Sequence, residues 1–126
     1  MPASCRRYST VYLVRNGQVL CSVEVASTRK QRARGLLGRT GFDGAMLFYR
    51  TSSVHTIGMR FAIDVAFCRK TAPGTLVVDS TTTMKPWRLG LPRFASSAVL
   101  EAEAGTFARW EIVPGDGLLL MPLRTD

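Results

Sequence analysis

The alternation of apolar and polar residues along the chain predicts a mainly β fold. Residues 8–15 and 18–26 alternate and are rich in β-branched side chains, and Asn16-Gly17 lies between them. This dipeptide suits a type I′ turn, because both of its residues tolerate a positive φ. The two segments therefore predict a β-hairpin. Further strands are predicted at 45–50, 59–68, 75–84, 97–105 and 117–123, and we expect the last two to pair.

One segment has helical periodicity instead. Thr28 and Gln31 have the spacing of a capping box, and Ala33, Leu36 and Leu37 fall on one helical face among basic residues. These features predict a short helix over about 29–37, whereas residues 106–117 form either one helical turn or a tight excursion. Short strands with one helix predict a single domain over residues 1–126. Its expected class is a β-sandwich or jelly-roll-like barrel with the helix packed on it.

Composition adds little to this picture except charge. The 126 residues carry a formal net charge of +8, but arginines are scattered along the chain and no aromatic residues alternate with them. Nucleic-acid binding through the basic residues 29–39 is therefore only an alternative. No apolar run reaches the roughly 20 residues of a membrane span, and no signal peptide is evident. The expected location is the cytoplasm, and the default oligomeric state is a monomer.

Most recognisable chemistry is missing from the sequence. Cys5, Cys21 and Cys68 are widely spaced and odd in number, so free thiols are expected, with Cys21 as a small core residue. A single histidine and scattered carboxylates give no metal-ligand spacing. No nucleophile elbow or phosphate loop is present. Accordingly, no metal and no cofactor are expected.

His55 and Asp64, in the stretch VHTIGMRFAID, are the two candidates for a catalytic pair. Asp64 interrupts an apolar strand, where a carboxylate requires hydrogen bonds or a counter-charge. Backbone amides or Arg34 could supply these, and the interpretation as a structural anchor is favoured. Its face also carries Ala66 and Cys68, which suggests a small cavity or an edge rather than the main core. His55 could be a base or a ligand contact, but tying its own loop to the barrel is the favoured role.

The segment around Arg34 suggests a special environment. Arg34 lies at the border of the apolar helix face, where its guanidinium could turn inward to a carboxylate such as Asp64 or Glu101. Gly35 beside it lowers helix stability by about 1 kcal/mol relative to Ala. This cost predicts that part of the backbone approaches closely at Gly35.

Several motifs together resemble the family known as domain of unknown function 192. They are ASTxxxRARGLLG at 26–38, GAMLF at 44–48, HTxxMRFxID at 55–64, LEAEAG at 100–105 and PGD at 114–116. The resemblance covers about 25–120, after the N-terminal hairpin strand, and Leu37 departs from the family's usual Met. It implies a compact β-sandwich or jelly-roll-like barrel and brings no activity. The positions that match the recurring pattern are Arg34, Gly35, Asp64, Glu101 and Gly105.

Three functions follow as hypotheses. The favoured one is a non-enzymatic module that binds a small ligand or a protein partner in one polar pocket. The residues expected to line or brace this pocket are Arg34, His55, Asp64, Lys85 and Glu101. An alternative is a hydrolase- or lyase-like enzyme that uses His55 with Asp64 or Glu101. A second alternative is a module that binds RNA or an anionic surface through the basic helix.

Overall fold

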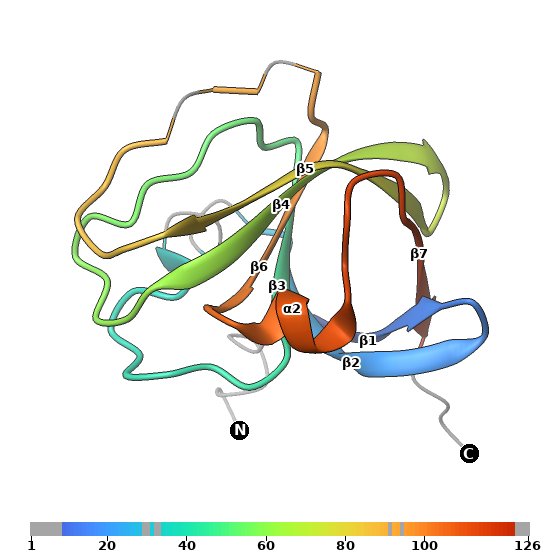
Figure 1. The fold of residues 1–126 in the computed structure, drawn as a ribbon, viewed down its shortest axis with the longest axis horizontal. Helices are drawn as coiled ribbons and strands as arrows, with labels where there is room; N and C mark the ends of the chain where they lie inside the picture. The colour runs from blue at the N-terminus through green and yellow to red at the C-terminus, as the bar shows by residue number, and fades with distance from the viewer. Residues whose placement is uncertain (1–8, 29–30, 32–33, 91, 94, 123–126) are drawn as a thin grey trace.

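Seven strands and one short helix are defined in the part of the chain that the structure describes. The structure is a computed structural model and describes residues 9–28, 31, 34–90, 92–93 and 95–122. The strands close into one barrel in the order β1-β2-β3-β6-β4-β5-β7 (Figure 1). Their bounds are β1 (Ser9–Arg15), β2 (Gln18–Ala26), β3 (Ala45–Tyr49), β4 (Ile63–Ala72), β5 (Thr75–Met84), β6 (Ala98–Glu103) and β7 (Gly117–Pro122); the helix is α2 (Thr106–Trp110). The mainly β prediction is confirmed, in the form of a closed barrel.

The predicted hairpin is present, but the predicted pairing of the last two strands is wrong. Asn16 and Gly17 have φ values of 51° and 78°, which are the positive angles of a type I′ turn between β1 and β2. β6 pairs with β3 and β4, whereas β7 closes the barrel between β1 and β5. Alternation shows which side chains share a face and carries no information about the neighbouring strand.

β2 and β3 are the only parallel neighbours in the described barrel, so the chain must cross over between them. The predicted helix over 29–37 belongs to this crossover and lies partly outside the described residues. The predicted capping box is confirmed, because the Gln31 amide donates to Thr28 Oγ1 at 3.0 Å and the Thr28 amide donates to Gln31 Oε1 at 3.1 Å. Within the described ranges, no helix is long and apolar enough to cross a membrane.

The close approach expected at Gly35 is also present. Gly35 has a φ of +50°, and a Cβ added there would lie 3.3 Å from the Phe48 ring. The approaching group is therefore a side chain of β3, whereas the sequence suggested a backbone segment. Leu36 next to it is buried against the barrel, as predicted for the apolar face of this segment.

The barrel has an apolar cluster on each side of its wall. β4 contributes Ala66 and Cys68 to the cluster inside the barrel, while Ile63, Val65 and Phe67 join a second cluster outside it. Small residues suit the interior, because a barrel of this size has room only for packed side chains. The expectation of a small cavity holds for Asp64, which lines a hollow at the end of this face, and is wrong for Ala66 and Cys68, which belong to the main core.

Two loops cover the outer cluster and are joined through Thr56 (Figure 1). These are residues 50–62 and the described residues of 85–97, namely 85–90, 92–93 and 95–97. The buried Thr56 hydroxyl donates to the Lys85 carbonyl and accepts from the Arg88 amide at 2.9 Å. The Thr56 amide also donates to the Arg88 carbonyl at 2.8 Å. The two loops therefore form one layer over this side of the barrel.

Thr56→Val should separate these loops without changing side-chain volume. The substitution leaves the Arg88 amide and the Lys85 carbonyl without their shared partner, so we expect a loss of about 1–3 kcal/mol in the free energy of unfolding. Urea denaturation measures it. Thr75→Val, an exchange of the same kind at the partly buried start of β5, is the control. Equal stability of Thr56→Val and wild type would show that the hydroxyl does not join the loops.

Candidate ligand-binding site

Glu101 is a buried carboxyl on the outer face of the barrel. It lies on β6 between Met46 of β3 and Val65 of β4, both of which are fully buried. Only 8% of its surface is exposed. An acidic side chain in such apolar surroundings is costly when ionised, so its position in the middle of the sheet calls for a functional explanation.

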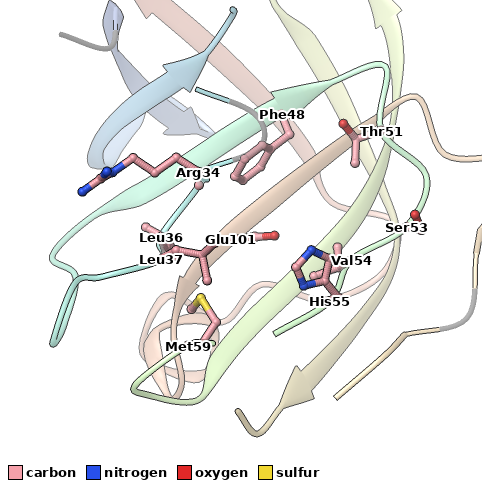
Figure 2. Close-up of a pocket in the computed structure, with 11 residues that line it drawn as sticks. Arg34, Leu36, Leu37, Phe48, Thr51, Ser53, Val54, His55, Met59 and Glu101 are labelled. Carbon is pink, nitrogen blue, oxygen red and sulfur yellow. The ribbon is translucent and has the colours of Figure 1, made fainter. Parts of the chain in front are cut away.

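The Glu101 side chain opens into a cavity of about 100 Å³ (Figure 2). The crossover, β3, β6 and the loop 50–62 all contribute to its wall. We call it the Glu101 cavity; its lining residues are Arg34, Gly35, Leu36, Leu37, Phe48, Thr51, Ser53, Val54, His55, Met59 and Glu101. Apolar side chains surround the carboxyl, and the hydroxyl and imidazole groups come from the loop. This combination is typical of a small-molecule site.

Burial raises the pKa of the Glu101 carboxyl from 4.5 to about 8. No hydrogen bond or ion pair of the described residues involves this carboxyl, and its oxygens border the cavity. At neutral pH the group is therefore mainly protonated, and it can both donate and accept a hydrogen bond. It is the polar anchor of the Glu101 cavity that protein contacts leave available to a ligand.

His55 lies at the rim of the same cavity, on an exposed part of the loop 50–62. Its Nδ1 accepts a hydrogen bond of 3.3 Å from the Ile57 amide, which leaves Nε2 as the nitrogen that carries the proton of the neutral ring. In Figure 2 the Glu101 carboxyl points toward the side of the pocket where His55 lies. No hydrogen bond or ion pair joins His55 to any carboxylate of the described residues.

Arg34 contributes to the wall of the Glu101 cavity, but its guanidinium does not enter it. The side chain is exposed, and Figure 2 shows the guanidinium pointing away from Glu101. The expected inward turn toward Asp64 or Glu101 is therefore corrected: neither ion pair occurs in the structure. Water solvates this guanidinium at less cost than a buried pair would require.

Asp64 lies in a different place, at one end of the barrel interior, and it acts as a structural anchor. Its Oδ1 accepts from the Thr83 hydroxyl at 2.7 Å, and its Oδ2 accepts from the amides of Gly105 and Phe107 at 2.9 and 3.0 Å. The carboxylate thus holds the start of α2 against β4 and β5. The Asp64 carboxylate is therefore held by backbone amides and a hydroxyl, and Arg34, the alternative partner, does not contribute. Asp64 and His55 line separate hollows, so the stretch VHTIGMRFAID does not form one catalytic pair.

The structure therefore divides the five residues predicted to bind a ligand. Arg34, His55 and Glu101 line one cavity, whereas Lys85 is exposed in a separate groove and Asp64 belongs to the barrel end. Phe48 and Met59 line the Glu101 cavity but were absent from the prediction. Both are apolar residues in apolar segments, so only the tertiary arrangement distinguishes them from the rest of the core.

The described cysteines and metal-binding side chains suggest no second reactive site. Cys21 and Cys68 are free, and burial is the main reason that the pKa of each thiol rises to about 12. Cys21 packs against the interior cluster, in agreement with its predicted role, while Cys5 lies outside the described residues. No group of three His, Cys, Asp or Glu side chains suited to a metal ion occurs in the described ranges.

Comparison with known proteins places the chain in a family and confirms the fold. The sequence model of the DUF192 family, described as an uncharacterized ACR, matches residues 11–120 and so includes the hairpin. A structure from Sinorhizobium meliloti, provisionally described as a transcription regulator, superposes with a TM-score of 0.68 at 22% identity, covering 90% of this chain and 95% of that one. A protein of unknown function from Novosphingobium aromaticivorans has a TM-score of 0.63 at 23% identity and coverage of 86% and 82%. Comparison with curated proteins gives no match.

Proposed function

The chain belongs to the DUF192 family, and from the geometry of its cavity we propose that it is a non-enzymatic protein that binds a small ligand at Glu101. The observation that carries the proposal is the buried Glu101 carboxyl, which faces a cavity and takes no hydrogen bond from the described residues. Burial removes most of the water from this carboxyl, so a ligand that enters the cavity and hydrogen-bonds to it replaces interactions that burial has taken away.

The size and lining of the cavity define the class of ligand. A volume of about 100 Å³ is below that of an apolar cavity of roughly 150 Å³ that holds a benzene-sized molecule. The buried part of the ligand is therefore a group of a few heavy atoms. A neutral Glu101 carboxyl complements an amide, urea or hydroxyl group, which both donates and accepts. Phe48, Leu36 and Met59 would contact the apolar part of the same ligand.

An enzymatic role has less support from the same site. General base catalysis by His55 would require a partner that orients the ring, and the described carboxylates do not hydrogen-bond to it. The Asp64 oxygens are already occupied by three donors. Binding without catalysis is therefore the function that the arrangement supports best.

A fragment screen by NMR tests this proposal. We expect small amides, ureas and alcohols to shift the resonances of Glu101, His55 and Met59. Glu101→Leu replaces the carboxyl by an apolar side chain of similar size. It should weaken the binding of these fragments about tenfold or more, because their anchor is lost. Glu103→Gln on the same face of β6, outside the cavity, keeps an acceptor for the Phe42 amide; it is the control and should bind as wild type does. Fragments that bind Glu101→Leu and wild type equally well would contradict the proposed site.

A further inference from the structure

The two loops that cover the outer cluster carry charge of one sign only. Residues 50–62 and 85–97 contain five basic residues and no acidic residue. The basic residues are Arg50, Arg60, Lys85, Arg88 and Arg93. Because Thr56 joins the two loops, these charges belong to one layer on the outside of the barrel (Figure 1). The layer presents a cationic surface to whatever approaches it.

Three large apolar side chains project from this same layer. Trp87 is 65% exposed, Leu89 is 78% exposed and Ile57 is 41% exposed. The bridge between His55 and Leu89 brings the two loops together at this point. The Trp87 backbone has a φ of +65°, and its amide donates to the Thr56 carbonyl at 2.8 Å. The loops thus hold Trp87 outward in a fixed geometry instead of folding it into the core.

Leu89 also lines a groove of about 380 Å³. Lys85, Arg88 and Arg93 are the charged residues among its lining, and Leu89 and Phe67 belong to the same wall. The Arg93 guanidinium lies over the Phe67 ring, 5.6 Å from its centroid, and this contact holds the cation at the groove. The groove therefore combines positive charge with apolar contact.

We propose that this loop surface, formed by Ile57, Lys85, Trp87, Arg88, Leu89 and Arg93, docks on the surface of a bilayer that contains anionic lipids. Trp87, Leu89 and Ile57 would enter the interface, where an indole and aliphatic side chains leave water favourably. Lys85, Arg88 and Arg93 would meet the phosphates of the lipid headgroups. Docking at this surface does not depend on the Glu101 cavity.

A bilayer fits the surface better than a nucleic acid does. Single-stranded nucleic acids bind through several aromatic side chains on which successive bases stack, and among the described residues of these loops Trp87 is the exposed aromatic side chain. Leu89 and Ile57 find no complementary group on a phosphate backbone. Acyl chains beneath anionic headgroups complement both the apolar and the basic residues of the loop surface.

Vesicle flotation with the full chain tests the proposal. We expect binding to vesicles of phosphatidylcholine mixed with phosphatidylglycerol, and at least tenfold weaker binding to phosphatidylcholine alone. The double variant Trp87→Ala, Leu89→Ala should lose at least tenfold in affinity for the mixed vesicles. Leu119→Ala, Met121→Ala removes similarly exposed apolar residues from β7 and should bind as wild type does. Since all four positions are exposed, unchanged urea denaturation identifies properly folded variants.

Fluorescence locates the contact. In Trp110→Phe, which leaves Trp87 as the single tryptophan, mixed vesicles should shift the emission of Trp87 to shorter wavelength. Lys85→Gln, Arg88→Gln should weaken binding and reduce its salt dependence. The proposal is overturned if the protein does not bind mixed vesicles, whether or not inorganic phosphate binds. It is also overturned if an RNA oligonucleotide binds the loop surface more tightly than the vesicles do at near-physiological salt. Vesicle binding that survives the Trp87, Leu89 double variant also overturns it.

Discussion

Asp64→Ala is expected to lower the free energy of unfolding by about 3–5 kcal/mol. The change removes three hydrogen bonds to one carboxylate, from the Thr83 hydroxyl and from the amides of Gly105 and Phe107. The Phe107 amide is buried, so it cannot turn to water in exchange. Chemical denaturation followed by circular dichroism measures the loss.

Two further variants separate this role from charge alone. Asp64→Asn keeps an acceptor for the amides and should lose less stability, about 1–2 kcal/mol. Asp79→Ala removes an exposed pair with Arg69 on the neighbouring strands and should change stability by less than about 1 kcal/mol. If Asp64→Ala were no less stable than Asp79→Ala, Asp64 would not be the anchor of α2.

Glu101→Gln should make the protein more stable, and increasingly so as pH rises from about 4.5 to about 8. In this interval the unfolded chain has released the Glu101 proton while the folded protein keeps it, so folding takes up a proton. The stability of wild type therefore falls with increasing pH by up to about 5 kcal/mol, since each pKa unit corresponds to about 1.4 kcal/mol. Gln is neutral at every pH and avoids this loss.

The measurement is urea denaturation at a series of pH values, and the quantity of interest is the difference between wild type and Glu101→Gln. Glu103→Gln serves as the control, because Glu103 lies on the same strand outside the cavity. Its stability should follow wild type across the series. A constant difference between wild type and Glu101→Gln from pH 5 to 9, roughly the range of the shifted pKa, would contradict a protonated Glu101.

The features that could be predicted from the sequence are local ones. The Asn16-Gly17 turn and the capping box of Thr28 and Gln31 involve residues at most a few positions apart, and both are present as predicted. Such features depend on backbone conformations and short-range hydrogen bonds that each residue type favours by itself. The positions of the strands could also be predicted locally, because apolar and polar residues alternate where one face of a strand is buried.

The features that could not be predicted depend on contacts between distant segments. Asp64 accepts hydrogen bonds from the amides of Gly105 and Phe107, which lie 41 and 43 positions further along the chain. From the sequence, its partners could therefore be named only as amides or an arginine. Lys85 and Glu101 were expected in one pocket, yet the two lie in separate hollows because the strand order places them apart. Arg34 was expected to turn inward, but solvation of its guanidinium costs less than burial. Three of the residues expected in the pocket, Arg34, His55 and Glu101, do line one cavity.

The central claim is that Glu101 is a desolvated, neutral carboxyl available to a ligand. The most direct test is a pH titration of the Glu101 side-chain carboxyl by carbon-13 NMR, with Glu101→Gln identifying its resonance. The structure predicts a pKa of about 8, well above the ordinary value of 4.5. A pKa near 4.5 would show that water already solvates the carboxylate, and the cavity would then lack the anchor on which the proposed function rests.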